Sequence, residues 1–169
     1  SLTINKKNLE ENIFKEKISA SVERRKDLRS LETFTIDPVD ARDFDDAISI
    51  EYDKSRLFIW VHIADVAEFV DYNSQIDKEA MLRGNSYYFP DRVYHMLPKI
   101  LSTRYCSLEP KVDRLSLSIK MNVDEKYNVT DYEIHETVIN SDKKFSYEEA
   151  GLILDKNEES DHTTSLHLL

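Results

Sequence analysis

The ten residues from Asp37 to Asp46 contain five aspartates: Asp37, Asp40, Asp43, Asp45 and Asp46. Carboxylates held a few ångström apart raise one another's pKa unless a cation offsets the repulsion. Mg²⁺ or Mn²⁺ is the natural cation, because both prefer oxygen ligands and no His or Cys lies nearby in the sequence. Such an ion lowers the pKa of a bound water and clamps the attacking and leaving oxygens of an in-line phosphoryl displacement. The cluster is therefore a candidate site for phosphodiester hydrolysis.

Two other interpretations of the cluster compete with this one. Aspartate is common in solvated turns, and the chain is rich in acids, with 33 Asp and Glu among 169 residues, so charge density decides little. A calcium site is the second alternative. The EF-hand pattern fails, because it needs Gly at the sixth loop position and Glu at the twelfth, where this chain has Arg42 and Ile48. From the residues alone, a magnesium site and a solvated or calcium-binding loop are equally supported.

The segments on either side of the cluster predict how it is positioned. Residues 33–37 are β-prone and end at Pro38, and residues 47–52 alternate as a strand does. The aspartates therefore lie where one strand ends and the next begins. Adjacent strand residues point to opposite faces, so Asp45 and Asp46 can share an ion only if the backbone bends, as a strand-end loop allows.

The rest of the chain predicts an α+β fold with a mixed, mostly antiparallel sheet and flanking helices. Residues 5–30 are typical of an amphipathic helical lead-in, and residues 57–63 of a central buried strand. A helix is expected over residues 73–83, capped by Asn73 or Ser74 and ended by Gly84. Residues 115–123 and 129–138 predict a long hairpin. Residues 146–154 predict a helix with Ser146 and Glu149 as a capping box. We expect a lead-in over 1–30, a catalytic region over 31–155 and a polar tail over 156–169.

Composition narrows the function classes further. The net charge of −10 argues against indiscriminate nucleic-acid binding, although metal ligands would contribute to it. No stretch approaches the roughly 20 apolar residues of a membrane helix. The single cysteine, Cys106, excludes an internal disulfide and fits a reducing, cytoplasmic compartment. We interpret Cys106 as a small buried hydrophobe, and His62, within an apolar strand, as a hydrogen-bonded core residue.

Four ordered segments resemble a known family. The string TIDPVDARDFDDAI (residues 35–48) is similar to the first signature of the catalytic RNB domain of the ribonuclease II/ribonuclease R family. Three further segments agree in order: VHIADV (61–66), RGNSYYFPDRVYHMLP (83–98) and LSTRYCSLEPKVDRL (101–115). The resemblance runs from about residue 30 to 155. DARDFDD and the YFP block favour the ribonuclease R side of the family.

The resemblance implies a processive 3′→5′ exoribonuclease. Such an enzyme hydrolyses single-stranded RNA to nucleoside 5′-monophosphates with Mg²⁺, for which Mn²⁺ is a possible substitute. Asp37, Asp43, Asp45 and Asp46 take the places of the four active-site, metal-site aspartates. Asp37 and Asp46 are the first candidates for metal ligands, and Asp45 is expected to be indispensable for the chemical step. Asp40 matches none of the four and is interpreted as a loop residue.

Two tyrosines are implied as RNA-binding residues. Tyr88 matches a tyrosine that stacks on the 3′-terminal base, and stacking suits an enzyme that must accept any base. The alternative for Tyr88 is a core tyrosine before a proline turn. Tyr147 matches a tyrosine associated with favouring RNA over DNA, where a phenol could sense the 2′-OH. The alternative for Tyr147 is a helix N-terminal residue packed on the hairpin.

The chain departs from the family in length. It is shorter than the family's catalytic domain, and the later catalytic arginine and the flanking OB-type domains are not visible in it. We therefore expect the N-terminal part of the catalytic domain, partnered in its parent by the rest of that domain, and inactive alone. Two rival hypotheses are a catalytically silent RNA-binding or scaffold module of the same fold and a calcium-binding acidic domain.

Overall fold

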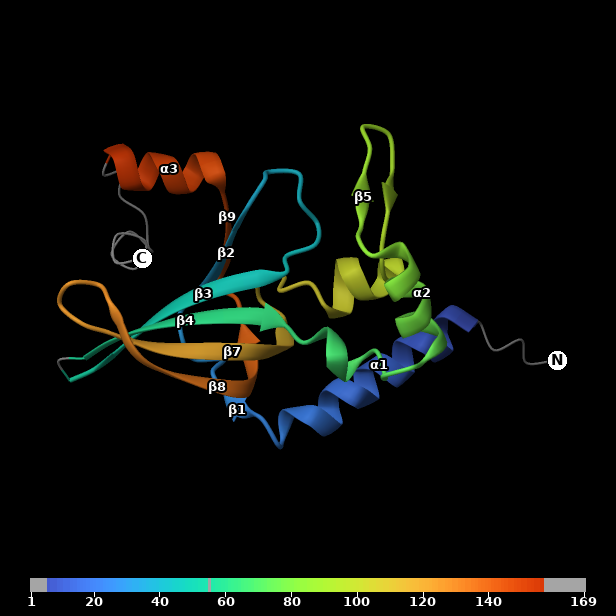
Figure 1. The fold of residues 1–169 in the computed structure, drawn as a ribbon, viewed down its shortest axis with the longest axis horizontal. Coiled ribbons are helices and arrows are strands. Elements are labelled where there is room, and N and C mark those ends of the chain that lie inside the picture. The colour runs from blue at the N-terminus through green and yellow to red at the C-terminus, as the bar shows by residue number, and fades with distance from the viewer. Residues whose placement is uncertain (1–5, 55, 157–169) are drawn as a thin grey trace.

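A seven-stranded sheet forms the centre of the molecule, with helices beside it (Figure 1). The computed structural model describes residues 6–54 and 56–156, so the predicted tail over 156–169 lies outside them except for Lys156. The elements in chain order are α1 (Lys6–Val22), β1 (Lys26–Asp27), β2 (Thr33–Asp37), β3 (Asp46–Asp53), β4 (Arg56–Ala64), the 3-10 turn η1 (Val66–Glu68), α2 (Gln75–Arg83), β5 (Tyr87–Tyr88), β6 (Val93–Tyr94), the π-helical turn η2 (Leu101–Tyr105), β7 (Asp113–Val123), β8 (Val129–Asn140), β9 (Lys143–Ser146) and α3 (Tyr147–Lys156).

The strands of the sheet follow the order β1-β8-β7-β4-β3-β2-β9. The pairs β2–β3, β3–β4, β4–β7 and β7–β8 are antiparallel, whereas β1–β8 and β2–β9 are parallel. The predicted mixed, mostly antiparallel sheet is therefore confirmed, as is the long hairpin, which is β7 and β8. Strand β9 was not predicted. Its register places Ser146 opposite Asp37, so the chain enters α3 beside the end of β2.

Strand β4 is central, as predicted, but it is not buried on both faces. Phe58, Trp60 and His62 are buried, whereas Ile63 on the opposite face is 44% exposed. The buried side belongs to the main core. Partly buried Phe14, Ile18 and Val22 of α1 pack against this core, which also contains Leu101 and Tyr105 of η2. The continuous apolar run hid this asymmetry, because both faces of β4 carry apolar side chains.

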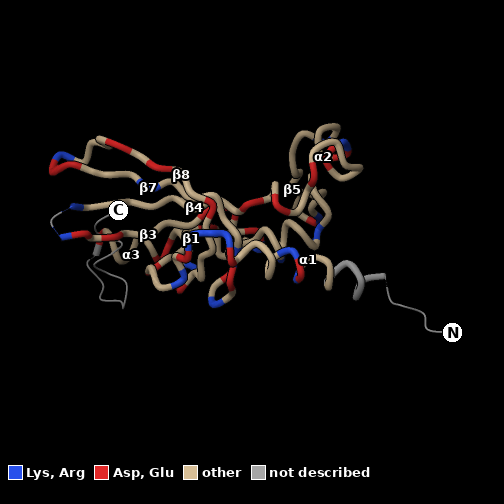
Figure 2. Tube along the Cα trace, turned by 90° about the horizontal axis from the view of Figure 1, so that it is seen from below, with Lys and Arg blue, Asp and Glu red and all other residues tan. Residues whose placement is uncertain are grey.

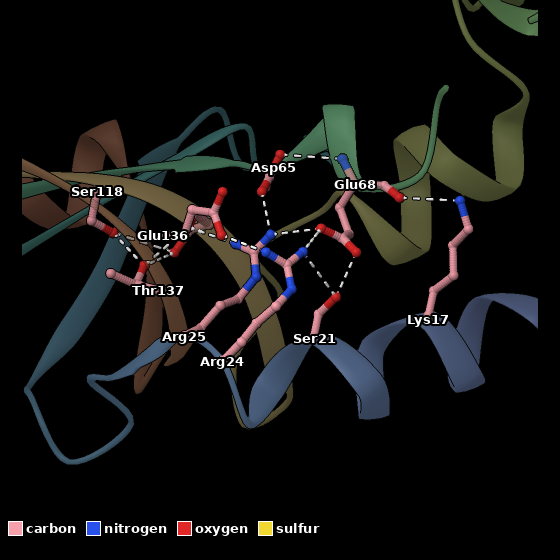
Figure 3. Close-up of polar contacts among 10 residues, drawn as sticks. Lys17, Ser21, Arg24, Arg25, Asp65, Glu68, Ser118, Glu136 and Thr137 are labelled. Atoms are coloured by element: carbon pink, nitrogen blue, oxygen red, sulfur yellow. Dashed lines mark hydrogen bonds and ion pairs between the residues drawn. The ribbon is translucent and has the colours of Figure 1, made fainter. Parts of the chain in front are cut away.

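Helix α1 is tied to the sheet by two consecutive arginines that follow it (Figure 3). The Arg25 side chain is fully buried and contacts Asp65 at 2.6 Å and Glu68 at 2.9 Å. Arg24 binds Glu68 and also contacts Glu136 of β8 at 2.6 Å. The lead-in predicted from residues 5–30 is therefore a helix, a turn and a short strand bound to the domain.

The predicted helix caps are confirmed. The Ser146 hydroxyl accepts a hydrogen bond from the Glu149 N–H at 3.1 Å, and the Glu149 carboxylate accepts one from the Ser146 N–H at 2.8 Å. Ser74 caps α2, and Gly84 ends it with a left-handed φ of 70°. Helix α3 then packs Ala150 and Ile153 against Phe34 and Phe145. Within the described residues, no helix combines the length and apolar composition needed to cross a membrane.

Candidate active site

The loop between β2 and β3 carries the acidic cluster. Asp37 is the last residue of β2 and Asp46 the first of β3, as predicted, and the two strands are antiparallel neighbours. The loop is fixed rather than free. Phe44 within it is buried, and its N–H donates to the Ser107 hydroxyl at 3.0 Å while its carbonyl accepts from Leu108 at 2.8 Å. The aspartates on either side of Phe44 are therefore held at defined positions.

Burial and mutual repulsion act on these carboxylates together. Burial raises the pKa of Asp37, and the charges of Asp46 and Asp43 raise it further, against the opposing effects of the Thr35 hydroxyl and of Lys144. Burial also raises the pKa of Asp45, with further contributions from Asp43, Asp46 and Asp37. The four predicted site aspartates thus lie close enough to influence one another. A cation would offset this repulsion.

The donor chemistry of the site fits Mg²⁺ or Mn²⁺. The Asp37 Oδ2 atom is buried without a hydrogen-bond partner, which is costly for a carboxylate. The surrounding candidate ligands are carboxylate oxygens, the type that hard divalent ions prefer. Among the described residues, no three carboxylate, imidazole or thiolate groups converge closely enough to hold an ion in this conformation. Binding therefore needs side-chain rotation that brings the carboxylates together.

Tyr88 reaches this cluster from a separate hairpin. Strands β5 and β6 form a two-stranded sheet that projects from the body of the molecule (Figure 1). The Tyr88 hydroxyl donates a hydrogen bond to Asp43 Oδ2, and this contact raises the pKa of Tyr88 to about 12. The side chain is 64% exposed, so the alternative of a core tyrosine is wrong. The structure brings Tyr88 to the aspartates with its ring open to solvent.

Tyr147 lies at the opposite side of the cluster. It is the first residue of α3 and directly follows Ser146, which pairs with Asp37. It is 60% exposed, so it occupies the helix N-terminus without being packed away. The side chain is free to meet a ligand that approaches the end of β2.

A groove joins the acidic loop and the hairpin. Its volume is about 660 Å³, and its lining residues include Asp37, Asp40, Arg42, Asp43, Tyr88, Phe89, His95 and Lys99. Figure 2 shows acidic and basic residues interspersed along the trace. Both kinds meet in this groove, so it combines candidate metal ligands with cations suited to phosphate. Arg42, His95 and Lys99 were not predicted as site residues, because isolated basic residues form no pattern in the sequence.

The two residues interpreted as structural are indeed buried. His62 is inaccessible, and its ring nitrogens contact Ser49 Oγ at 2.9 Å and Ser118 Oγ at 2.7 Å. Burial lowers the pKa of His62 to about 4, so it is neutral near pH 7. Burial raises the pKa of the Cys106 thiol to about 12, which makes it a poor nucleophile. Asp40 lies in the loop as expected, and it also lines the groove.

Comparisons with known proteins identify the family that the chain resembles. The RNB domain family matches residues 25–169. A ribonuclease R from Chlamydia pneumoniae is 47% identical over 149 residues, which cover 87% of this chain and 22% of that protein. The chain thus spans about a fifth of the length of that relative.

Solved structures show the same fold. Mycoplasma genitalium RNase R in complex with ribose-methylated single-stranded RNA matches with a TM-score of 0.78 and 34% identity, over 85% of this chain and 23% of that one. Yeast Ssd1, described as a pseudonuclease, matches with a TM-score of 0.75 and 19% identity, over 86% and 18% of the two chains. The second likeness concerns the fold alone.

Proposed function

The chain belongs to the RNB domain family, and from that premise we propose that it is part of a ribonuclease R-like 3′→5′ exoribonuclease. The proposed reaction hydrolyses single-stranded RNA to nucleoside 5′-monophosphates with Mg²⁺, or Mn²⁺ in its place. The observation that carries the proposal is the placement of Asp37, Asp43, Asp45 and Asp46 at and between two adjoining strand ends. Asp37 and Asp43 line a groove that Tyr88 also lines, and Asp45 lines an adjacent cavity with Asp43 and Tyr88. We propose a cytoplasmic location for the parent protein.

The four aspartates would hold the divalent ion. When bound, the ion supplies a Lewis acid that activates a water and neutralises charge on the scissile phosphate. The chain's own residues present the carboxylates and contact the RNA. The loop between β2 and β3 presents the carboxylates, anchored at Phe44 by its two backbone hydrogen bonds. Arg42 and Lys99, which line the same groove, are placed to contact the phosphates of the approaching strand.

The RNA end is proposed to enter between the two tyrosines. The exposed ring of Tyr88 offers a face for the terminal base, and a stacked base needs no particular sequence. Tyr147, beyond the end of β2, would approach the sugar and sense its 2′-OH. Both assignments rest on motif positions and on the exposure of the two side chains.

The chain offers only one part of such a site. We propose that the remainder of the RNB domain and flanking OB-type domains, supplied by a parent chain, complete the active site and grip the RNA. The low coverage of ribonuclease R relatives supports this proposal. The 169-residue chain alone would then bind divalent metal weakly and degrade RNA poorly or not at all.

Replacement of Asp45 by Asn in the parent protein tests the proposed function. Asp45→Asn should lower the release of nucleoside monophosphates from labelled single-stranded RNA by roughly 10²–10⁴-fold, because it removes a group proposed to act in the chemical step. Asp40→Asn is the matched control, since it changes the same residue type in the same loop at a position outside the four. Equal activity of both variants would reject the proposed site. The same assay on the 169-residue chain should show little or no product.

A catalytically silent RNA-binding or scaffold module is the alternative. The same fold occurs in a structure described as a pseudonuclease, so the fold alone does not imply nuclease activity. The complete four-aspartate set argues for the enzyme. If Asp45→Asn leaves both RNA binding and RNA turnover in the parent protein unchanged, the silent module becomes the better description.

A further inference from the structure

One hydrogen bond joins the projecting hairpin to the acidic loop. Its donor is the Tyr88 hydroxyl and its acceptor is Asp43 Oδ2, on segments 45 residues apart in the chain. The adjacent tyrosine differs. The Tyr87 hydroxyl reaches only the Arg83 carbonyl, at 3.5 Å, among the contacts of the described residues. The two neighbours are thus similar in exposure, 53% for Tyr87 and 64% for Tyr88, but only Tyr88 touches the cluster.

This hydrogen bond stands between two cavities. The groove of about 660 Å³ contains Asp37 in its wall, and a second cavity of about 280 Å³ contains Asp45. Asp43 and Tyr88 are the two residues that line both cavities, as far as the structure describes them. Asp43 is therefore the carboxylate that connects the two halves of the cluster.

We propose that Tyr88 is a positioning residue for the metal site, whose hydroxyl holds Asp43 between Asp37 and Asp45 while its exposed ring receives a base. The inference rests on the proposed function and adds a second role to a residue implied only in stacking. The hydrogen bond occupies one oxygen of Asp43 and leaves the other for an ion. Partners of this kind orient metal ligands, and their loss lowers metal affinity.

The physical reason lies in the repulsion within the cluster. Asp43 lies within three residues of the like charges of Asp45 and Asp46, so an unrestrained Asp43 side chain would gain by swinging away from them. A fixed donor opposes that movement. The RNA base and the metal ion then both depend on the Tyr88 side chain. RNA should therefore raise the affinity for the ion, and the ion the affinity for RNA, by the same factor.

The test separates the hydroxyl from the ring. Mn²⁺ binding to the RNA-free parent protein is measured by electron paramagnetic resonance of the free ion, for the unaltered form, Tyr88→Phe and the control Tyr87→Phe. We expect Tyr88→Phe to weaken Mn²⁺ binding by about tenfold or more, and Tyr87→Phe to leave it unchanged. Single-stranded RNA affinity is then measured in EDTA. Tyr88→Phe should keep it, and Tyr88→Ala should weaken it by roughly an order of magnitude.

Three results would contradict this proposal at different points. If folded Tyr88→Phe, with the thermal midpoint of Tyr87→Phe, binds Mn²⁺ as tightly as the unaltered parent protein or more tightly, the hydroxyl does not position Asp43. If Tyr88→Phe loses RNA affinity in EDTA, the hydroxyl acts on RNA and the proposed division of roles is wrong. If the unaltered parent protein shows no saturable Mn²⁺ binding sensitive to Asp45→Asn, the proposed metal site fails and this inference fails with it.

Discussion

At Asp37, a carboxylate oxygen is buried at the end of a strand without a hydrogen-bond partner. Asp40, three residues later, lies in the exposed part of the same loop. The two residues are identical in type, and their charges contribute equally to the charge density of the segment. What separates them is desolvation, which makes the first a costly group unless a cation approaches it. For this pair of residues, burial and not charge distinguishes a candidate ligand from a solvated acid.

The same principle gives a prediction for His62. Burial holds the pKa of His62 near 4 in the folded chain, compared with 6.5 for the exposed group. Between these values the unfolded chain binds a proton that the folded chain does not. The free energy of unfolding should therefore be unaffected by this group above about pH 6.5 and fall by roughly 1.4 kcal/mol per pH unit below it. The total effect down to about pH 4 is of order 3 kcal/mol.

Urea unfolding at several values between pH 4 and 7 measures this effect. His62→Gln keeps a neutral polar group between Ser49 and Ser118 and should flatten the pH dependence relative to the unaltered chain. The control is His135→Gln, at the sheet surface, where the ring contacts Glu133 at 2.8 Å. Parallel pH curves for the unaltered chain and His62→Gln would show that His62 is not the group responsible.

At the scale of elements, the sequence predicted the helices and strands that depend on residues close together in the chain. The helix predicted over 73–83 from its cap and from Gly84 forms over 75–83. The alternation of apolar residues located the hairpin of β7 and β8, and Ser146 with Glu149 located the start of α3. Short elements held by distant partners were not predictable. Strand β9 has four residues and forms only because β2 lies beside it, and β5–β6 is a pair of two-residue strands. Tyr88 therefore could not be placed against Asp43 from the sequence, because the contact depends on that hairpin.

The anchoring of α1 is a second case of this kind. Arg24 and Arg25 follow a charged helix and are indistinguishable from surface residues in the sequence. In the structure, Arg25 is buried and donates to Asp65, Glu68 and the Ser116 carbonyl, the last at 3.2 Å (Figure 3). Its Nε atom has no partner, so the site already carries a desolvation cost.

We predict that Arg25→Met lowers the free energy of unfolding by about 3–5 kcal/mol, because it leaves the carboxylates of Asp65 and Glu68 without their buried cation. Arg29→Met is the matched control. Arg29 binds Asp27 and Asp113 at 2.6 and 2.9 Å, but its side chain is 39% exposed. Exposed ion pairs contribute about 1 kcal/mol or less. Chemical denaturation with a common m value compares the two, and equal losses would mean that burial of Arg25 does not matter.

At the scale of the whole molecule, the two faces of the sheet differ. Residues directly opposite each other on neighbouring strands share a face. Ile63 pairs with Leu117, Ile119 with Ile134, and Met121 with Tyr132, so these side chains form one apolar face. Helix α3 covers only the part of it near Phe34 and Ile48. Ile63, Leu117, Tyr132 and Ile134 are 44%, 44%, 64% and 56% exposed. Contiguous apolar surface of this kind is typical of an interface.

We predict that the isolated chain self-associates through this apolar face. Pairing through the sheet edges is less favourable, since the edge strands β1 and β9 have only two and four residues. Sedimentation equilibrium over a range of concentrations should show association of the unaltered chain. Ile134→Lys should weaken it by placing a charge in the centre of the face. Leu82→Lys, which changes an apolar residue of α2 that is 89% exposed and lies outside this sheet face, should leave it intact. A chain that stays monomeric at the highest concentration reached, or equal association of both variants, would show that this face does not drive self-association.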